Sequence, residues 1–166
     1  MKKYPNFDIR EFVPKSIFDK YGANSTWFIN EKVIALAQFY KDFFTKYYKN
    51  KNDAVKNILI VVNNWHSGGT LQQRGFRPPE SETGAGLSQH RFCNAFDCDI
   101  IIVLKDDTRK EADYTEIHKI INEYNDMFLE AGLTTVESPE DAPTWLHSDC
   151  RWIEGQTKIL TVRYKK

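Results

Sequence analysis

SQHRFCNAFD, residues Ser88 to Asp97, ends next to a strongly apolar run, DIIIVL, residues Asp99 to Leu104. This stretch places His90 and Asp97 seven residues apart, directly ahead of a segment that can fill a core. Seven residues are too many for one helical turn and too few for two separate elements. The spacing therefore suits a turn that leads into a strand, with one polar side chain on each.

A second histidine, His147, lies far downstream in TWLHSDCR, residues Thr144 to Arg151. Two imidazoles and one carboxylate leave the fourth position of a tetrahedral zinc ion open, which is the arrangement of catalytic zinc sites. We therefore predict a zinc site with His90, Asp97 and His147 as ligands. For a lone histidine, a hydrogen-bonded structural role would be the default interpretation, and only the shared context of the three residues favours a metal.

These segments resemble a known family of enzymes. SQHRFCNAFD resembles the S-x-H-x-x-G-x-A-x-D signature of the zinc D-alanyl-D-alanine carboxypeptidases and of the L-alanyl-D-glutamate endopeptidases of phage lysins. WLHSD resembles the second histidine segment of that family, and GFRPP (Gly75 to Pro79) resembles the element that precedes the zinc motif. The resemblance implies a hedgehog/DD-peptidase fold, which is an α+β fold with a small antiparallel sheet flanked by helices.

The resemblance also implies substrate-binding residues. Arg77 corresponds to the substrate-binding arginine of the family, with Arg74 as a nearby alternative, and Ser88 is expected to form a hydrogen bond within the histidine turn. Cys93 stands where the family has glycine. If that position requires a positive φ, a cysteine there is strained, because only glycine adopts such a conformation freely.

The general base is harder to predict. The family places an acidic residue or a histidine two or three positions before the second histidine, but Thr144 and Trp145 occupy those positions here. Asp141 and Glu137 precede this segment and could reach the site. Asp149 is a further candidate, either as a base or as the partner that fixes the tautomer of His147.

The composition is that of one soluble domain covering residues 1–166, with 41% hydrophobic and 28% charged residues. A formal net charge of zero argues against a nucleic-acid partner. We expect a monomer with no membrane partner, because no apolar run approaches the length of a membrane span. The beginning of the chain has no apolar segment, so we expect no signal peptide and synthesis in the cytoplasm. Three cysteines, Cys93, Cys98 and Cys150, predict free thiols that fill space, with additional metal ligation as an alternative.

Hydrophobic periodicity predicts the main elements. We expect helices at Lys15–Gly22, Ile29–Asn50 (capped by Asn30 or Ser25) and Glu111–Ala131, and strands at Asn57–Asn64, Ala95–Leu104, Leu133–Ser138, Thr144–Ile153 and Lys158–Lys165. Between the first two strands, Trp65–Leu87 is rich in glycine and has no helical period, so we expect the rim of a cleft.

The main hypothesis is a zinc peptidase that cleaves peptidoglycan stem peptides with a metal-activated water. Such an enzyme would reach the cell wall after phage lysis or as part of a virion. The alternative is a catalytically inactive binding or structural module with the same fold, because Thr144 and Cys93 depart from the family pattern. A metal-free protein with coincidental motifs is a third possibility.

Overall fold

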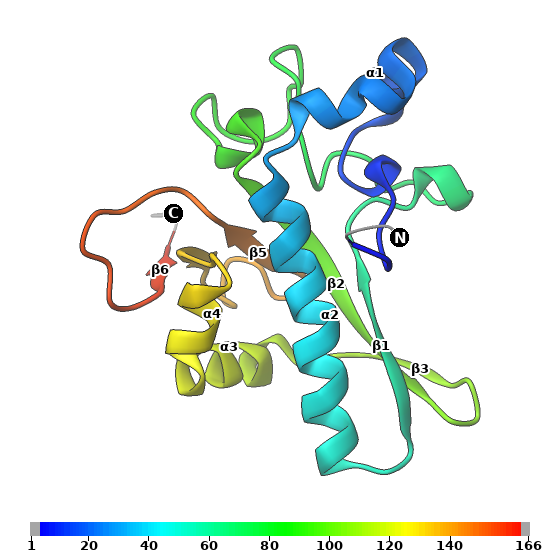
Figure 1. The fold of residues 1–166 in the computed structure, drawn as a ribbon, viewed down its shortest axis with the longest axis vertical. Helices are drawn as coiled ribbons and strands as arrows, with labels where there is room; N and C mark the ends of the chain where they lie inside the picture. The colour runs from blue at the N-terminus through cyan, green and yellow to red at the C-terminus, as the bar shows by residue number, and fades with distance from the viewer. Residues whose placement is uncertain (1–3, 164–166) are drawn as a thin grey trace.

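A long central strand, β2 (Ala95–Leu104), joins the two halves of a six-stranded sheet in the computed structural model, which describes residues 4–163 (Figure 1). The other strands are β1 (Val55–Val61), β3 (Arg109–Glu111), β4 (Thr135–Glu137), β5 (Leu146–Asp149) and β6 (Leu160–Val162). The second half of β2 pairs with β1 and β3, and its first half pairs with β5. β4 and β6 complete the order β1-β2-β5-β4-β6. The fold is therefore α+β, as predicted.

The sheet is not purely antiparallel, which corrects the sequence-based prediction. β4 and β6 run parallel to each other, whereas the other strand pairs are antiparallel. A parallel neighbour needs a long connection, and here β5 and the segment that follows it lie between β4 and β6 in the chain. The predicted final strand began at Lys158, but β6 spans only Leu160–Val162, and positions 164 and 165 of that prediction lie outside the described residues.

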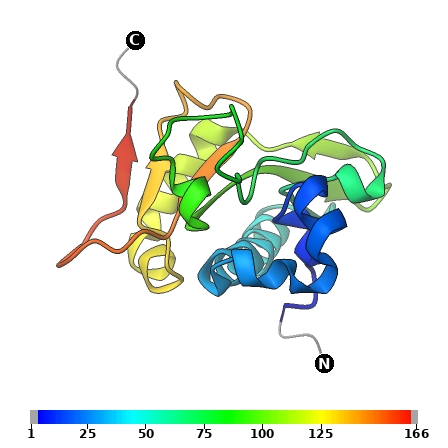
Figure 2. The same cartoon turned by 90° about the horizontal axis from the view of Figure 1, so that it is seen from above.

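The helix α2 (Glu31–Lys51) packs against one face of the sheet, below the strands in Figure 2. Its start is fixed by Asn30, whose side chain accepts a hydrogen bond from the Lys32 amide, so Asn30 rather than Ser25 is the cap. The buried Tyr40 hydroxyl lies 2.8 Å from Ser148 Oγ on β5 and ties the helix to the sheet. The short helix α1 (Lys15–Tyr21) also forms as predicted.

The predicted helix Glu111–Ala131 is wrong in two respects. Glu111 belongs to β3, and the helical part is divided into α3 (Tyr114–Glu123) and α4 (Asn125–Glu130). The break lies at Tyr124, where φ is −105° and ψ is 30°. The Asn125 side chain accepts from the Ile159 amide at 3.0 Å and donates to the Thr157 carbonyl at 3.0 Å. This tertiary contact with the segment before β6 favours the break over the helical propensity of the sequence.

Around Asp97 the two faces of the sheet differ, because side chains alternate along a strand. On β2, Phe96, Cys98 and Ile100 point into the hydrophobic core, which extends from Phe7 near the beginning of the chain to Ile159 near its end. The residues between them, including Asp97, point to the other face. A polar site can therefore lie on β2 without interrupting the core.

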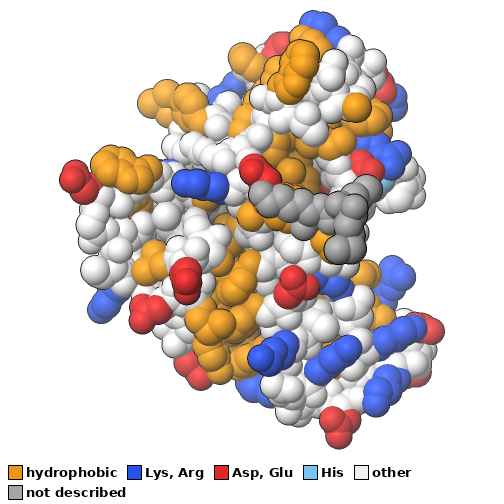
Figure 3. Space-filling view, viewed as in Figure 1, with side chains coloured by type: hydrophobic (Ala, Val, Ile, Leu, Met, Phe, Trp, Pro, Cys, Tyr) orange, Lys and Arg blue, Asp and Glu red, His pale blue; other side chains and the backbone are white. Residues whose placement is uncertain are grey.

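The surface shows no continuous basic region on the face drawn in Figure 3. Basic side chains gather there at the end of α2, whose last turn carries Lys49 and Lys51. Hydrophobic side chains follow the seam between α2 and the α3–α4 pair, where rings such as Phe43 and Tyr124 are partly buried. Within residues 4–163, none of the helices has the length and apolar character needed to cross a membrane.

Candidate metal centre

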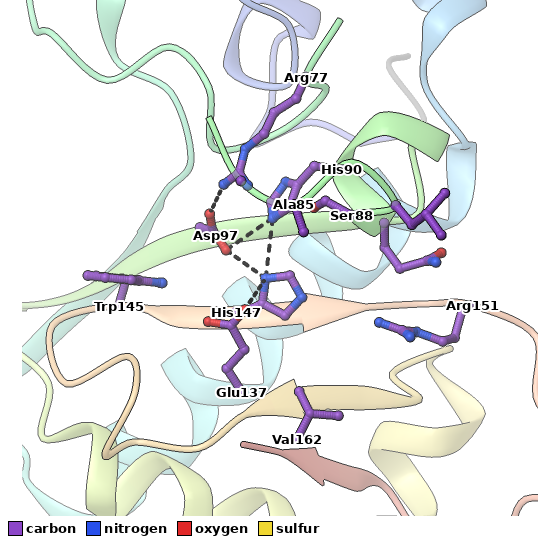
Figure 4. A pocket seen from close by; sticks show the side chains of 13 residues that line it. Arg77, Ala85, Ser88, His90, Asp97, Glu137, Trp145, His147, Arg151 and Val162 are labelled. Atoms are coloured by element: carbon purple, nitrogen blue, oxygen red, sulfur yellow. Dashed lines mark hydrogen bonds and ion pairs between the residues drawn. The ribbon is translucent and has the colours of Figure 1, made fainter. Parts of the chain in front are cut away.

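The three predicted ligands meet at one point of the structure. His90 Nε2 lies 3.3 Å from Asp97 Oδ1 and 3.2 Å from His147 Nδ1, and the distance from His147 Nδ1 to Asp97 Oδ1 is 2.8 Å. All three residues are buried. The structure thus brings together a triangle of two imidazole nitrogens and one carboxylate oxygen, drawn at the centre of Figure 4.

The sheet register creates most of this triangle. Asp97 on β2 is the direct cross-strand partner of His147 on β5, so their side chains are neighbours on the same face. His90 comes from a short 3-10 helix, Gln89–Phe92, that precedes β2. Cys93 ends this turn with φ at 59°, in the left-handed region, and its amide donates to the His90 carbonyl. The position does require a positive φ, as the family glycine suggested.

Both imidazoles have an oxygen behind them, at hydrogen-bond distance for His90 and farther away for His147. The Gly75 carbonyl lies 2.8 Å from His90 Nδ1, so that nitrogen carries the proton and Nε2 presents its lone pair to the site. Asp149 Oδ2 lies 3.7 Å from His147 Nε2 and favours the proton on that nitrogen, which leaves Nδ1 for the site. Such outer partners are typical of metal-binding histidines. Asp149 therefore lies on the side of His147 where a partner that fixes the tautomer would lie.

The Gly75 carbonyl owes its position to a close backbone contact. A side chain at residue 75 would place its Cβ 2.2 Å from the Phe12 carbonyl oxygen, so only glycine fits there. The same carbonyl oxygen accepts a 2.7 Å hydrogen bond from the Phe76 amide. The backbone at Phe12 thus holds in place the loop whose Gly75 carbonyl orients His90.

The dimensions of the triangle fit a tetrahedral metal. With metal–nitrogen and metal–oxygen bonds of roughly 2.0–2.1 Å, tetrahedral ligand atoms lie ~3.3 Å apart. The observed separations of 2.8, 3.2 and 3.3 Å are close to this value, with one side slightly shorter. The ligand type, the tautomers and the spacing therefore agree that His90, Asp97 and His147 could hold a metal ion.

The protonation of the metal-free chain follows from the same contacts. Burial alone would raise the pKa of Asp97, but His90 and His147 outweigh burial and hold the pKa of this carboxyl well below its usual range. Burial favours a neutral His147, but Asp149 and Asp97 outweigh it and raise the pKa of His147 to about 9. At neutral pH His147 of the metal-free chain is therefore protonated, and its Nδ1 donates a hydrogen bond to Asp97 Oδ1 in the place where a metal would bind.

Arg77 contacts a candidate ligand directly. Its Nη2 donates to Asp97 Oδ2 at 2.7 Å, and its Nε donates to the Gln73 carbonyl at 2.7 Å. Only Oδ1 of Asp97 faces the histidines, so the arginine favours ligation through a single carboxylate oxygen. The alternative arginine, Arg74, instead pairs with Asp99 on β2.

Glu137 is the carboxylate that the structure places beside the ligands. It lies at the end of β4, next to β5, and its Oε1 is 3.8 Å from His147 Nδ1. Asp141 lies farther along the same connection, where its amide donates to the Ser138 carbonyl, and it is not among the residues that line the cavity. Of the acids considered for the base, Glu137 therefore has the best position, and Asp149 is held at the back of His147 instead.

A cavity of about 560 Å³ opens over the triangle. Its wall includes Ser88, Trp145 and Arg151, which are labelled in Figure 4. Gly84 and Leu87 from the predicted rim also line it. The prediction that the glycine-rich segment forms the edge of a cleft is confirmed. The Ser88 side chain does not cap the histidine turn, but the Ser88 carbonyl accepts a 2.9 Å hydrogen bond from the Arg91 amide within it.

Arg151 also lines the cavity, and the sequence analysis does not predict it as a site residue. His147, Asp149 and Arg151 follow one another at every second position, and this spacing places side chains on one face of an extended chain. This two-residue period is the sequence pattern that would have placed Arg151 on the same face as His147.

The three cysteines are free thiols, and Cys98 and Cys150 belong to the hydrophobic core. Cys150 Sγ lies 3.3 Å from the Asn94 carbonyl oxygen. The prediction that these two thiols fill space is confirmed, and they are not part of the His90–Asp97–His147 triangle.

Comparisons with models of protein families, with curated proteins and with solved structures found no match to this chain. The chemistry of the site therefore carries the functional inference.

Proposed function

We propose that this chain is a zinc peptidase of the hedgehog/DD-peptidase type that cleaves peptidoglycan stem peptides, at a D-Ala-D-Ala or an L-Ala-D-Glu bond. The observation that carries the proposal is the buried His90–Asp97–His147 triangle with Glu137 beside it, at the base of a cavity. The volume of about 560 Å³ is in the range of small-ligand sites. The motif resemblance supplies the substrate class.

Zinc is the metal that suits this ligand set. Two imidazole nitrogens and one carboxylate oxygen are ligands of catalytic zinc, and three protein ligands leave a position for water. When bound there, zinc would lower the pKa of a water to roughly 7 and polarise the scissile carbonyl.

The other residues of the site transfer the proton and keep the ligands oriented. Glu137 accepts the proton of the attacking water and passes it to the leaving amine, since its carboxylate lies next to His147. Arg77 keeps Asp97 in a single orientation through the 2.7 Å hydrogen bond to Oδ2. The oxygens behind both histidines keep the lone pairs directed at the site.

The alternative, an inactive binding or structural module, was motivated by the missing acid at Thr144 and by Cys93. The position of Glu137 supports the enzyme, because a carboxylate from β4 can take the role of the missing acid. The proposal places its action at the bacterial cell wall, reached by phage lysis or by carriage in a virion.

The proposal is tested by incubating zinc-loaded protein with purified stem peptides and identifying the cleavage products by mass spectrometry. Cleavage by the natural chain, absent in His147→Ala, supports it. A protein that binds zinc and peptide but cleaves neither bond supports the inactive module instead. A protein that binds no zinc contradicts the peptidase.

A further inference from the structure

The cavity over the metal site has carboxylates at its centre and two arginines in its wall. Asp97 and Glu137 supply the negative charge, and Arg77 and Arg151 supply the positive charge. The zinc ion of the proposed function would offset these two carboxylates and bind the scissile carbonyl, so a free carboxylate of the substrate beside the reacting bond needs a separate cation. Arg77 and Arg151 are the two arginines of the wall that could supply this cation.

Arg77 is committed to the metal site. Its guanidinium donates to Asp97 Oδ2 and to the Gln73 carbonyl, and only 12% of its side chain is exposed. Gly84 packs closely over it, since a Cβ at that glycine would lie 2.7 Å from Arg77 Nη1. Arg77 therefore braces Asp97 and has little room to turn toward a substrate.

Arg151 is placed differently. Its Nε lies 2.9 Å from both carboxylate oxygens of Asp149, and its Nη2 also contacts Asp149. Asp149 is fully buried, but 38% of the Arg151 side chain is exposed. Figure 4 shows the guanidinium directed toward His147, on the side of that ring away from Glu137 and Trp145. Asp149 thus orients one edge of the guanidinium, and the cation remains part of the cavity wall.

We propose that Arg151 forms a carboxylate-binding subsite that reads the free carboxylate next to the scissile bond. The inference rests on the proposed peptidase function. In both candidate bonds, the carbon that carries the scissile nitrogen also carries a free α-carboxylate: the terminal one in D-Ala-D-Ala and the α-carboxylate of D-Glu in L-Ala-D-Glu. Arginine is suited to such a group, because its planar fork forms paired hydrogen bonds with a carboxylate. One subsite would therefore serve either bond.

The test compares each peptide with its amide, in which the carboxylate becomes an uncharged carboxamide. The probes are N-acetyl-D-Ala-D-Ala with its C-terminal amide, and L-Ala-D-Glu with L-Ala-D-isoglutamine. For zinc-loaded wild-type protein, we expect kcat/KM for the acid to exceed that for the amide by about 10- to 100-fold, the effect of one charge-assisted pair. Equal rates for acid and amide in the wild type overturn the inference without any variant.

Substitution then assigns the preference to Arg151. Arg151→Gln is expected to lower the rate on the acid, chiefly through KM, and to remove the preference, whereas Arg151→Lys restores part of it. Arg163→Gln is the matched control, because Arg163 also pairs with a carboxylate, Glu140, but lies outside the cavity wall. If Arg151 only braces Asp149, then Arg151→Gln will lower the rates on acid and amide by the same factor, and that result overturns the inference.

Failure of the peptidase itself gives a separate result. If zinc-loaded wild-type protein cleaves none of the probes, the proposed function is wrong, and binding of the same probes is measured by calorimetry. Tighter binding of the acids, lost in Arg151→Gln, would still support the subsite. Equal affinity for acid and amide, including no measurable binding of either, overturns it.

Discussion

Glu137 follows the core residue Val136 on β4 and, because side chains alternate along a strand, it faces the candidate metal site. We expect Glu137→Gln to lower the rate of stem-peptide hydrolysis by about 10²- to 10⁴-fold, the usual contribution of a general base. Zinc binding should be retained, because Glu137 is not one of the three ligands. The measurement is kcat on a stem peptide, together with zinc content.

Asp141→Asn is the matched control for this prediction, since Asp141 is an acid of the same connection that lies outside the cavity wall. It should retain the wild-type rate. The role of Glu137 is contradicted if the two variants lose activity equally.

Cys93 provides a second test at the level of one residue. Its φ of 59° costs a residue with a Cβ roughly 1–3 kcal/mol, and a β-branched residue is the least compatible with it. Cys93→Val should therefore be less stable to urea than Cys93→Gly by at least about 1 kcal/mol. Equal stability of the two variants would show that the turn does not depend on the left-handed conformation.

The three candidate ligands could be selected from the sequence because their types and spacing lie within two short segments. Glu137 could only be one of several candidates, because it reaches His147 through the neighbouring strand β4. That neighbour relationship is a property of the sheet and is not encoded in local spacing. Arg77 was identified, but its contact with Asp97 depends on the fold of the loop that carries it.

Among the elements, the break between α3 and α4 depends on Asn125. We expect Asn125→Ala to lower the free energy of unfolding by about 1–2 kcal/mol, because it removes two hydrogen bonds to the segment before β6. Hydrogen exchange at the Ile159 amide should become faster, and this amide is the direct readout. Asn122→Ala, at an exposed asparagine of α3, should leave exchange at the Ile159 amide unchanged. Unchanged exchange at Ile159 in Asn125→Ala would contradict this role.

The elements that were predicted well are those whose stability comes from their own pattern. α2 has an apolar face at three- and four-residue steps and a cap at Asn30, and the second half of β2 is a run of strong strand formers, Ile100 to Val103. The division of α3 from α4 and the parallel pairing of β6 could not be predicted in the same way. Both arise from contacts between segments that are distant in the sequence.

For the whole molecule, the raised pKa of His147 links stability to pH. The metal-free folded chain holds this proton with a pKa of about 9, above the value of about 6.5 for an exposed histidine. The stabilisation is therefore complete below about pH 6.5 and is lost as pH rises through 9. We expect the free energy of unfolding of metal-free protein to fall over this interval, by on the order of 3 kcal/mol at most.

Urea denaturation of metal-free protein at several pH values measures this slope. His147→Gln should lack it, and His118→Gln should retain it, because burial lowers the pKa of His118 and moves its effect to acidic pH. In zinc-loaded protein the trend should reverse, since the metal competes with the proton for His147 Nδ1. A slope that persists in His147→Gln would assign the effect to another group.

Zinc content is the most direct test of the metal centre, measured by elemental analysis of untagged protein after zinc addition and dialysis. We predict about one zinc per chain, as for a three-ligand catalytic site, lost in His147→Ala and retained in His118→Ala, whose histidine is buried on α3. Absence of zinc from the wild-type chain, or its retention in His147→Ala, would contradict the His90–Asp97–His147 site.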